Sequence, residues 1–195
     1  MRPICSALLL ATLAGPASAQ DMRAQETARL DRFDAVVGQA VLAAMAGGSR
    51  GDVDLLQDAL SGQPVPAFET TLPGDWICRT LKLGGNLSLV VYAPFTCRID
   101  VDGTGFTLEK LTGSQLTRGT ITLRDDRMIY LGVGYAAGAD APAYDGLPVA
   151  DAGDGTFQPE VGVVQQTGPD TVRIMFPAPV VESDFDILYL TRQDS

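Results

Sequence analysis

Histidine is absent from the 195 residues, and lysine occurs only as Lys82 and Lys110. Without histidine the chain cannot form a Ser-His-Asp or Cys-His catalytic system, nor bind zinc, copper or haem through imidazole. The chemistry that stays open is that of carboxylates and of hard metal ions held by oxygen ligands. We therefore expect no catalytic residue, no metal site and no cofactor, and a binding protein rather than an enzyme.

Long apolar runs are also missing, since none reaches the roughly 20 residues of a membrane-spanning helix. The apolar run at residues 4–14 follows Arg2 and precedes a Gly-Pro break and the sequence Ala17-Ser18-Ala19. A positive start, a short apolar segment and an A-x-A end are typical of a secretory signal peptide. We predict that residues 1–19 are cleaved, and that the mature protein is periplasmic or secreted and does not span a membrane.

Cysteine is scarce, and one of the three residues, Cys5, lies in the predicted signal peptide. The mature chain keeps Cys78 and Cys97, and in an oxidising compartment an even number of cysteines favours pairing. A bridge between them would stabilise the fold by about 3 kcal/mol in the chain-entropy model. We predict a disulfide between Cys78 and Cys97.

Positive charge is low relative to negative charge. The net charge is −10, and the loss of Arg2 with the signal peptide takes one positive charge away and gives −11. An acidic chain without a basic patch is repelled by nucleic acid and by anionic membranes. The expected partner is an unknown small ligand or a cationic envelope protein, and nucleic acid is not expected.

The residues after the signal peptide divide into a helical part and a β-rich part. Apolar residues recur at helical spacing between Gln25 and Ala46, and Gly47-Gly48 ends this pattern. Ser49 and Asp52 resemble a capping box before a second, shorter helix that Gly62 and Pro64 end. We predict an N-terminal helical segment over residues 20–63 and a β domain over residues 64–195.

The β domain shows short strand patterns separated by turn residues. We predict strands near 75–83, 87–92, 95–102, 105–111, 115–124, 127–134, 160–166, 170–176 and 184–192. Short connections such as Asp125-Asp126 favour antiparallel hairpins. The predicted fold is therefore mainly β: an antiparallel up-and-down barrel of eight or nine strands preceded by two short helices, with a sandwich as the alternative.

Gly74-Asp75-Trp76 opens the first predicted strand, and Arg192 lies near the end of the last. This resembles the calycin barrels, which include lipocalins and bacterial metalloprotease inhibitors, where a G-x-W tryptophan packs under a terminal arginine. The resemblance implies that Trp76 and Arg192 form a cation–π pair at the barrel floor. The alternative is an ordinary core tryptophan.

Two segments repeat an aromatic-x-Cys-Arg pattern, at Trp76 to Arg79 and at Phe95 to Arg98. Residues two apart share a strand face, so each aromatic residue accompanies its cysteine. If Trp76 points into the barrel, then Leu81 and Leu83 point outward and need cover, either by the N-terminal helices or through a bulge that switches the face.

The same two segments, together with residues 109–119, are similar to an exported proteobacterial family that is classed only as a domain of unknown function. The resemblance covers about residues 70–192. It implies no activity, because the family has none assigned.

The strand pattern stops between residues 135 and 159, where a loop carries a possible site formed by Tyr144, Asp145, Asp151 and Asp154. The acids do not follow the order of a known calcium loop, and a plain surface loop is the alternative. Carboxylates on the predicted strands are a second set of candidates: Asp75, Asp100, Asp102, Glu109, Asp184 and Asp186. Two of them facing across a cleft would suit a glycosidase, although alternating acids are also typical of a solvent face.

The leading hypothesis is a non-catalytic periplasmic β-barrel that binds a small apolar ligand in its interior or a protein at its loops. The first alternative is a periplasmic inhibitor of a protease or of a lysozyme-like enzyme. The second is a carboxylate-dependent hydrolase of envelope polysaccharide.

Overall fold

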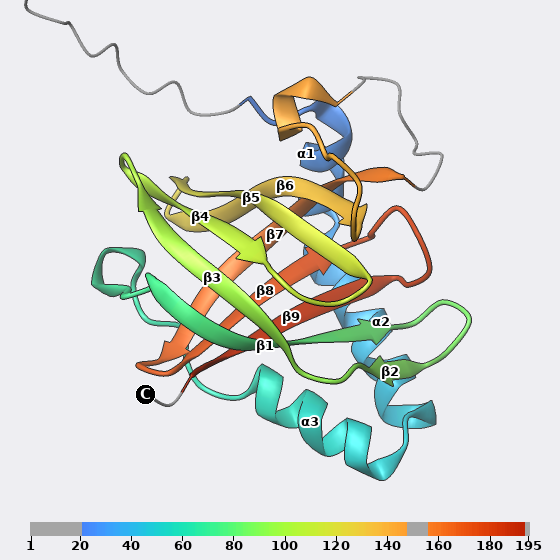
Figure 1. Ribbon diagram of the computed structural model, residues 1–195. Coiled ribbons are helices and arrows are strands. Elements are labelled where there is room, and N and C mark those ends of the chain that lie inside the picture. Colours follow the sequence, from blue (N-terminus) through green and yellow to red (C-terminus); the bar gives the residue numbers. More distant parts are fainter. Residues whose placement is uncertain (1–20, 148–155, 194–195) are drawn as a thin grey trace, which may run out of the picture.

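A nine-stranded antiparallel sheet forms most of the molecule (Figure 1). The computed structural model describes residues 21–147 and 156–193, so the predicted signal peptide lies outside the described residues. The strands are β1 (Gly74–Leu83), β2 (Leu89–Val91), β3 (Phe95–Asp102), β4 (Gly105–Lys110), β5 (Gln115–Arg124), β6 (Arg127–Ala136), β7 (Phe157–Gly168), β8 (Thr171–Pro177) and β9 (Phe185–Arg192). Strand β9 pairs with β1 and closes eight strands into a barrel, while β2 pairs with β1 as an extra strand. The predicted antiparallel barrel is thereby confirmed.

Tight turns fix the register of neighbouring strands. Between β5 and β6 only Asp125 and Asp126 form the turn, with φ of 47° and 62°. Aspartate is one of the few residue types other than glycine that adopts this left-handed conformation at low cost. Gly103 and Thr104 join β3 to β4 in a turn of the same length. These short connections explain why the strands follow one another around the barrel in chain order.

Three helices precede the barrel, where the sequence predicted two. They are α1 (Ala24–Asp31), α2 (Phe33–Gly47) and α3 (Arg50–Leu60). The first predicted helix is interrupted at Arg32, whose φ of −94° and ψ of 4° are not helical. The restart places Phe33 edge-on against Phe185 of β9, with ring centres 5.6 Å apart. The break thus coincides with the contact between Phe33 and Phe185, and the spacing of apolar residues along the sequence does not predict such a tertiary contact. None of the helices among the described residues has the length and apolarity needed to cross a membrane.

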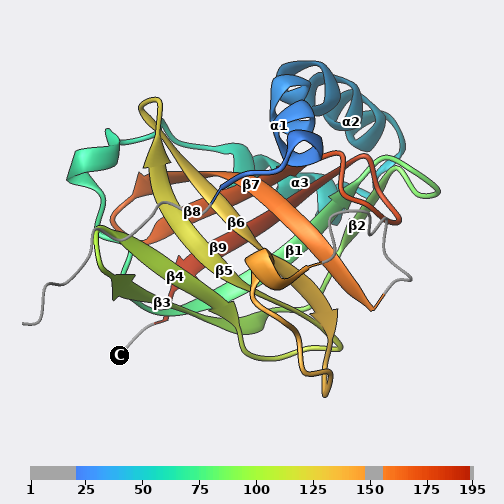
Figure 2. The same ribbon diagram turned by 90° about the horizontal axis from the view of Figure 1, so that it is seen from above.

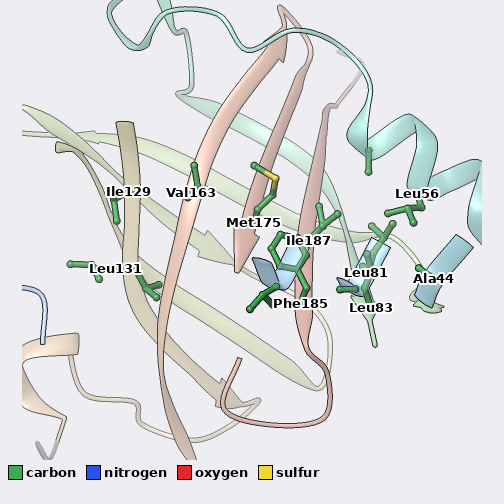
Figure 3. Packing of buried hydrophobic residues seen from close by; sticks show 14 of the residues in the cluster. Ala44, Leu56, Leu81, Leu83, Ile129, Leu131, Val163, Met175, Phe185 and Ile187 are labelled. Atoms are coloured by element: carbon green, nitrogen blue, oxygen red, sulfur yellow. The ribbon is translucent and has the colours of Figure 1, made fainter. Parts of the chain in front are cut away.

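The helices lie together along one outer side of the barrel (Figure 2). There they cover an apolar stripe of the outer wall, and Leu81 and Leu83 of β1 pack with Ala44 and Leu56 of the helices (Figure 3). Burial of such side chains stabilises the fold by about 1.5–3 kcal/mol each. The apolar outward face of β1 is thus covered by the N-terminal helices, and no switch of face is needed.

A second hydrophobic core fills part of the barrel interior. Trp76 and Cys78 of β1 and Cys97 and Ile99 of β3 all point into it and are fully buried. Cys78 and Cys97 form the predicted disulfide, which joins adjacent strands inside the barrel. The two cores lie on opposite faces of the same sheet, so β1 is apolar on both faces for part of its length.

Candidate functional site

One end of the barrel is closed by Trp76 and the segment that precedes β1. The indole Nε1 donates to the carbonyl of Leu72 at 3.0 Å, and the guanidinium of Arg192 lies 3.9 Å from the indole ring centre. Arg192 also donates to the carbonyls of Pro73 and Thr71, each at 2.8 Å. These contacts hold residues 71–73 across the barrel end, so a ligand cannot enter there.

The other end of the barrel holds a pocket of about 140 Å³. It lies where β4, β6 and β8 end and where β5, β7 and β9 begin. The side chains that carry charge around it come from five different elements: Arg29, Lys82, Lys110, Glu160 and Asp186. Apolar residues including Phe176 and Leu188 also line it, and both belong to the inner hydrophobic core. The interior of the barrel is therefore apolar at the closed end and charged at the open end.

Two glycines of β6 leave space for larger side chains in and beside this pocket. A Cβ atom on Gly132 would lie 2.2 Å from the hydroxyl oxygen of Tyr130, and one on Gly134 would lie 2.5 Å from Oε1 of Glu160. Such distances are well below van der Waals contact, so an alanine at either position would displace its neighbour. The sequence Leu131-Gly-Val-Gly134 thus creates an inward face with room for one tyrosine and one buried acid.

Glu160 is held in the pocket by a chain of hydroxyl groups. The hydroxyl of Thr117 donates to a carboxyl oxygen of Glu160 and also lies 2.5 Å from the hydroxyl of Tyr130. Burial raises the pKa of Glu160 to about 7, and the opposing effects of the Thr117 hydrogen bond and of Arg29 are smaller. A carboxyl group with this pKa exchanges its proton near neutral pH, which is the property of a proton donor or acceptor at a functional site.

Lys82 and Asp186 form an ion pair across β1 and β9. Their charged atoms are 3.4 Å apart, and Lys82 also lies 3.1 Å from a carboxyl oxygen of Glu182. The hydroxyl of Ser183 donates to Asp186 at 2.5 Å. Burial raises the pKa of Asp186, although Lys82 partly offsets it. The charge of each member is therefore compensated. Lys82 has two carboxylates beside it, and Asp186 has an ammonium group and a hydroxyl donor.

Lys110 differs from Lys82, because its ammonium group contacts no carboxylate among the described residues. It donates to the carbonyl of Gln115 at 2.5 Å and lies 3.9 Å from the ring centre of Phe95. Only 7% of the residue is exposed, and burial lowers its pKa. A buried ammonium that has only a carbonyl and an aromatic ring for partners is poorly compensated.

The barrel wall separates beside the pocket, between β7 and β8. Pairing of β7 with β8 begins only at Val163, whereas β7 itself begins at Phe157. Pro159 and Pro177 flank the gap, and proline has no N–H group to donate to a neighbouring strand. Arg29 of α1 fills the gap by donating to the carbonyls of Pro159 at 2.9 Å and of Pro177 at 3.0 Å. We call this junction the β7–β8 seam; a helix completes the wall there.

Of the four loop residues named from the sequence, the structure describes Tyr144 and Asp145. Tyr144 is buried and donates to Glu26 of α1 at 2.8 Å, and Asp145 is exposed. Asp151 and Asp154 lie outside the described residues. Within residues 21–147 and 156–193 no cluster of three potential metal-binding side chains occurs. Tyr144 therefore attaches its loop to α1.

Of the strand carboxylates named from the sequence, only Asp186 lines the pocket. The others are exposed: Asp75, Asp100, Asp102, Glu109 and Asp184. Asp75 pairs with Arg98 on the outer surface at 2.8 Å, and Asp184 accepts a hydrogen bond from the backbone of Gly85. These exposed acids match the alternative interpretation of a solvent face.

Sequence reasoning missed Glu160, which was placed at the start of a strand without a role. The available signal was the pair of glycines at alternate positions of the neighbouring strand, since two missing side chains on one strand face leave space opposite them. The sequence also shows Lys82 and Lys110 as the two lysines but does not predict that they lie together, and both line the pocket.

The fold and the pocket together define a disulfide-containing antiparallel β-barrel with one closed end and a charged cavity at the other. The chain belongs to the family described as DUF4893, a domain of unknown function, whose profile matches residues 19–190. Neither the search of curated proteins nor the search of solved structures found a match.

Proposed function

We propose that this protein is an exported, non-catalytic binding protein that holds a small polar ligand in the open end of its barrel. The observation that carries this proposal is the pocket of about 140 Å³, in which buried and half-buried charged groups from several strands converge. Convergence of a few polar groups in an otherwise well-packed interior is typical of ligand sites. Buried charge is costly to maintain, and a ligand that uses it gives a reason for its presence.

The size of the pocket limits the ligand. A cavity of about 150 Å³ holds benzene, and pockets for drug-sized molecules are about 300–1,000 Å³. The space here therefore suits a molecule of about six to nine non-hydrogen atoms. A lipid or another long apolar molecule does not fit, because the rest of the interior is filled by the inner core.

Export is part of the proposal. It is supported by the sequence of residues 1–19, which is typical of a signal peptide, and by the disulfide between Cys78 and Cys97. We infer a periplasmic or secreted location. The test is the mass of the protein recovered from cells, which is expected to correspond to a chain that begins at Gln20; recovery of a full-length cytoplasmic chain contradicts it.

Ligand binding is tested by a thermal-shift screen of small neutral, cationic and anionic metabolites. Thr80 lines the pocket, so Thr80→Phe is expected to fill it and to abolish any shift seen with the unchanged protein. The matched control is Thr122→Phe, because Thr122 lies next to inward-facing Ile121 on β5 and so points outward. Loss of the shift in both variants, or in neither, contradicts binding in the pocket.

A carboxylate-dependent hydrolase is a second candidate, and the pKa of Glu160 favours it. Glu160 and Asp186 line the same pocket, and a carboxyl group with a pKa of about 7 suits a general acid. The test is release of reducing ends from envelope polysaccharide. A hydrolase loses this activity on Glu160→Gln, whereas the binding proposal expects no release from either protein.

The inhibitor alternative receives less support from the fold. In the bacterial metalloprotease inhibitors that the G-x-W pattern resembles, an extended N-terminal segment enters the protease, whereas residues 24–60 here form helices packed on the barrel wall. Inhibition of a periplasmic protease or lysozyme by the purified protein would support this alternative.

A further inference from the structure

The charges of the pocket are not equally balanced, and this difference indicates what the ligand carries. Asp186 has Lys82 and Ser183 beside it, and Glu160 has Thr117. Among the described residues, the ammonium group of Lys110 contacts the carbonyl of Gln115 and the ring of Phe95 and no carboxylate. Among the described residues that line the pocket, Arg29 and Lys110 are therefore the cations without a carboxylate in contact, and each carboxyl group has a hydrogen-bond donor. Arg29 donates to two carbonyls, those of Pro159 and Pro177, whereas Lys110 donates to the carbonyl of Gln115 alone.

Glu160 can change its hydrogen-bonding role according to what enters the pocket. When it is ionised, it accepts from Thr117; when it is protonated, it has a proton to donate. The groups that influence it come from every neighbouring element: Arg29 of α1, Lys82 of β1, Lys110 of β4, Thr117 of β5, Tyr130 of β6 and Asp186 of β9. Of these, Asp186 is the acid that disfavours a second negative charge, and Arg29 and Lys82 oppose it.

We propose that the ligand is a small carboxylate bound between the ammonium group of Lys110 and the carboxyl group of Glu160, and that one proton is taken up by Glu160 on binding. This inference rests on the proposed function. The ligand supplies the negative charge that Lys110 lacks, and protonated Glu160 donates to the ligand instead of repelling it. A carboxylate entering beside an ionised Glu160 would meet a like charge at low dielectric, which disfavours that state.

The first test measures affinity for benzoate and lactate against their neutral amides, benzamide and lactamide, by calorimetry at pH 6. Each acid is expected to bind at least tenfold more tightly than its amide. Lys110→Met is expected to remove this preference, and the matched control Arg50→Met, which removes an exposed cation of α3, is expected to keep it. Equal binding of acids and amides refutes the carboxylate inference but leaves the proposed function standing. Binding of none of the four, with a thermal-shift screen that is also empty, refutes the proposed function.

The second test follows affinity with pH. Burial raises the pKa of Glu160 to about 7, so proton uptake predicts that acid binding weakens about tenfold for each unit above pH 7 and changes little between pH 5.5 and 6.5. Glu160→Gln keeps a donor but cannot ionise, and its affinity is expected to be independent of pH across this range. An unchanged pH dependence in Glu160→Gln refutes the role of Glu160.

A third measurement observes ligand binding in the unsubstituted protein and uses variants only to assign resonances. Because the chain contains only two lysines, lysine labelled with ¹³C at Cε gives two resonances, and each is assigned from the Lys→Met variant of the other. Titration with benzoate is expected to shift the Lys110 resonance in a saturable way and more than that of Lys82. A shift confined to Lys82 contradicts the proposed contact.

Discussion

Arg192 is the register partner of Trp76 across β1 and β9, and its guanidinium carbon lies 3.9 Å from the centre of the indole ring. Six residues further along β1, Lys82 faces Asp186 across the same two strands. The strand pair that closes the barrel thus carries a cation–π contact at the closed end and an ion pair at the open end.

Replacing Arg192 is expected to loosen the closed end. Arg192→Gln removes the cation–π contact and weakens the attachment of Thr71 and Pro73, so we expect a loss of about 2 kcal/mol in the free energy of unfolding. The emission of Trp76, the single tryptophan, should move to longer wavelength as water reaches it. The matched control Arg98→Gln breaks only the exposed pair with Asp75 and should cost much less than Arg192→Gln. Equal losses in the two variants would contradict this account.

The disulfide is expected to contribute about 3 kcal/mol to stability, because it closes a loop of 19 residues. The double variant Cys78→Ala/Cys97→Ala should lower the midpoint of urea unfolding accordingly. Titration of the denatured parent with a chromogenic disulfide reagent should detect no free thiol in the mature chain. Two free thiols there would remove the basis for this prediction.

The stability of the fold should depend on pH through Glu160. Its pKa is about 7 in the folded protein, above the ordinary value of 4.5, so the folded state binds the proton more tightly than the unfolded state. Stability therefore falls as pH rises from about 4.5 to 7, by on the order of 3 kcal/mol in total, and stays low above pH 7. Glu160→Gln should remove most of this fall, while Glu109→Gln, at an exposed position of β4, should leave it unchanged. Denaturant unfolding between pH 4.5 and 8.5 measures the difference.

Arg29 is expected to stabilise the β7–β8 seam. Arg29→Met leaves the carbonyls of Pro159 and Pro177 without their donor, which is expected to cost about 2–3 kcal/mol. Amide exchange at residues 157–162 should also become faster, because these residues pair only with β6. Arg32→Met, at an exposed position between α1 and α2, is the control and should change neither quantity. Unchanged exchange in Arg29→Met would show that the seam closes without this side chain.

The strands could be predicted because alternation and turn residues act locally. The Asp125-Asp126 turn and the N-cap of α3, where Ser49 accepts from the backbone of Asp52 at 3.2 Å, depend on neighbouring residues alone. The break at Arg32 was not predictable in this way, since Phe33 packs on Phe185, which is distant in the sequence.

The pocket was predictable only in part for the same reason. Asp186 was named as one acid among six, but its partner Lys82 becomes its neighbour only when β9 meets β1. Glu160 acquires its raised pKa from burial, and that burial depends on Gly134 on another strand. Single residues could thus be proposed from the sequence, whereas their combination required the register of the closed barrel.

From the contact of Arg29 with the β7–β8 seam, we expect the first helix to protect the molecule from self-association. Residues 157–162 do not pair with β8, and Arg29 covers this edge through the carbonyl of Pro159. Exposed strand edges are sites at which two copies of a chain can pair. A protein shortened to begin at Val65 would lose Arg29 and the helices over Leu81 and Leu83. It would then expose an unpaired strand edge next to an apolar wall. We expect such a protein to aggregate, so that its ligand binding could not be measured.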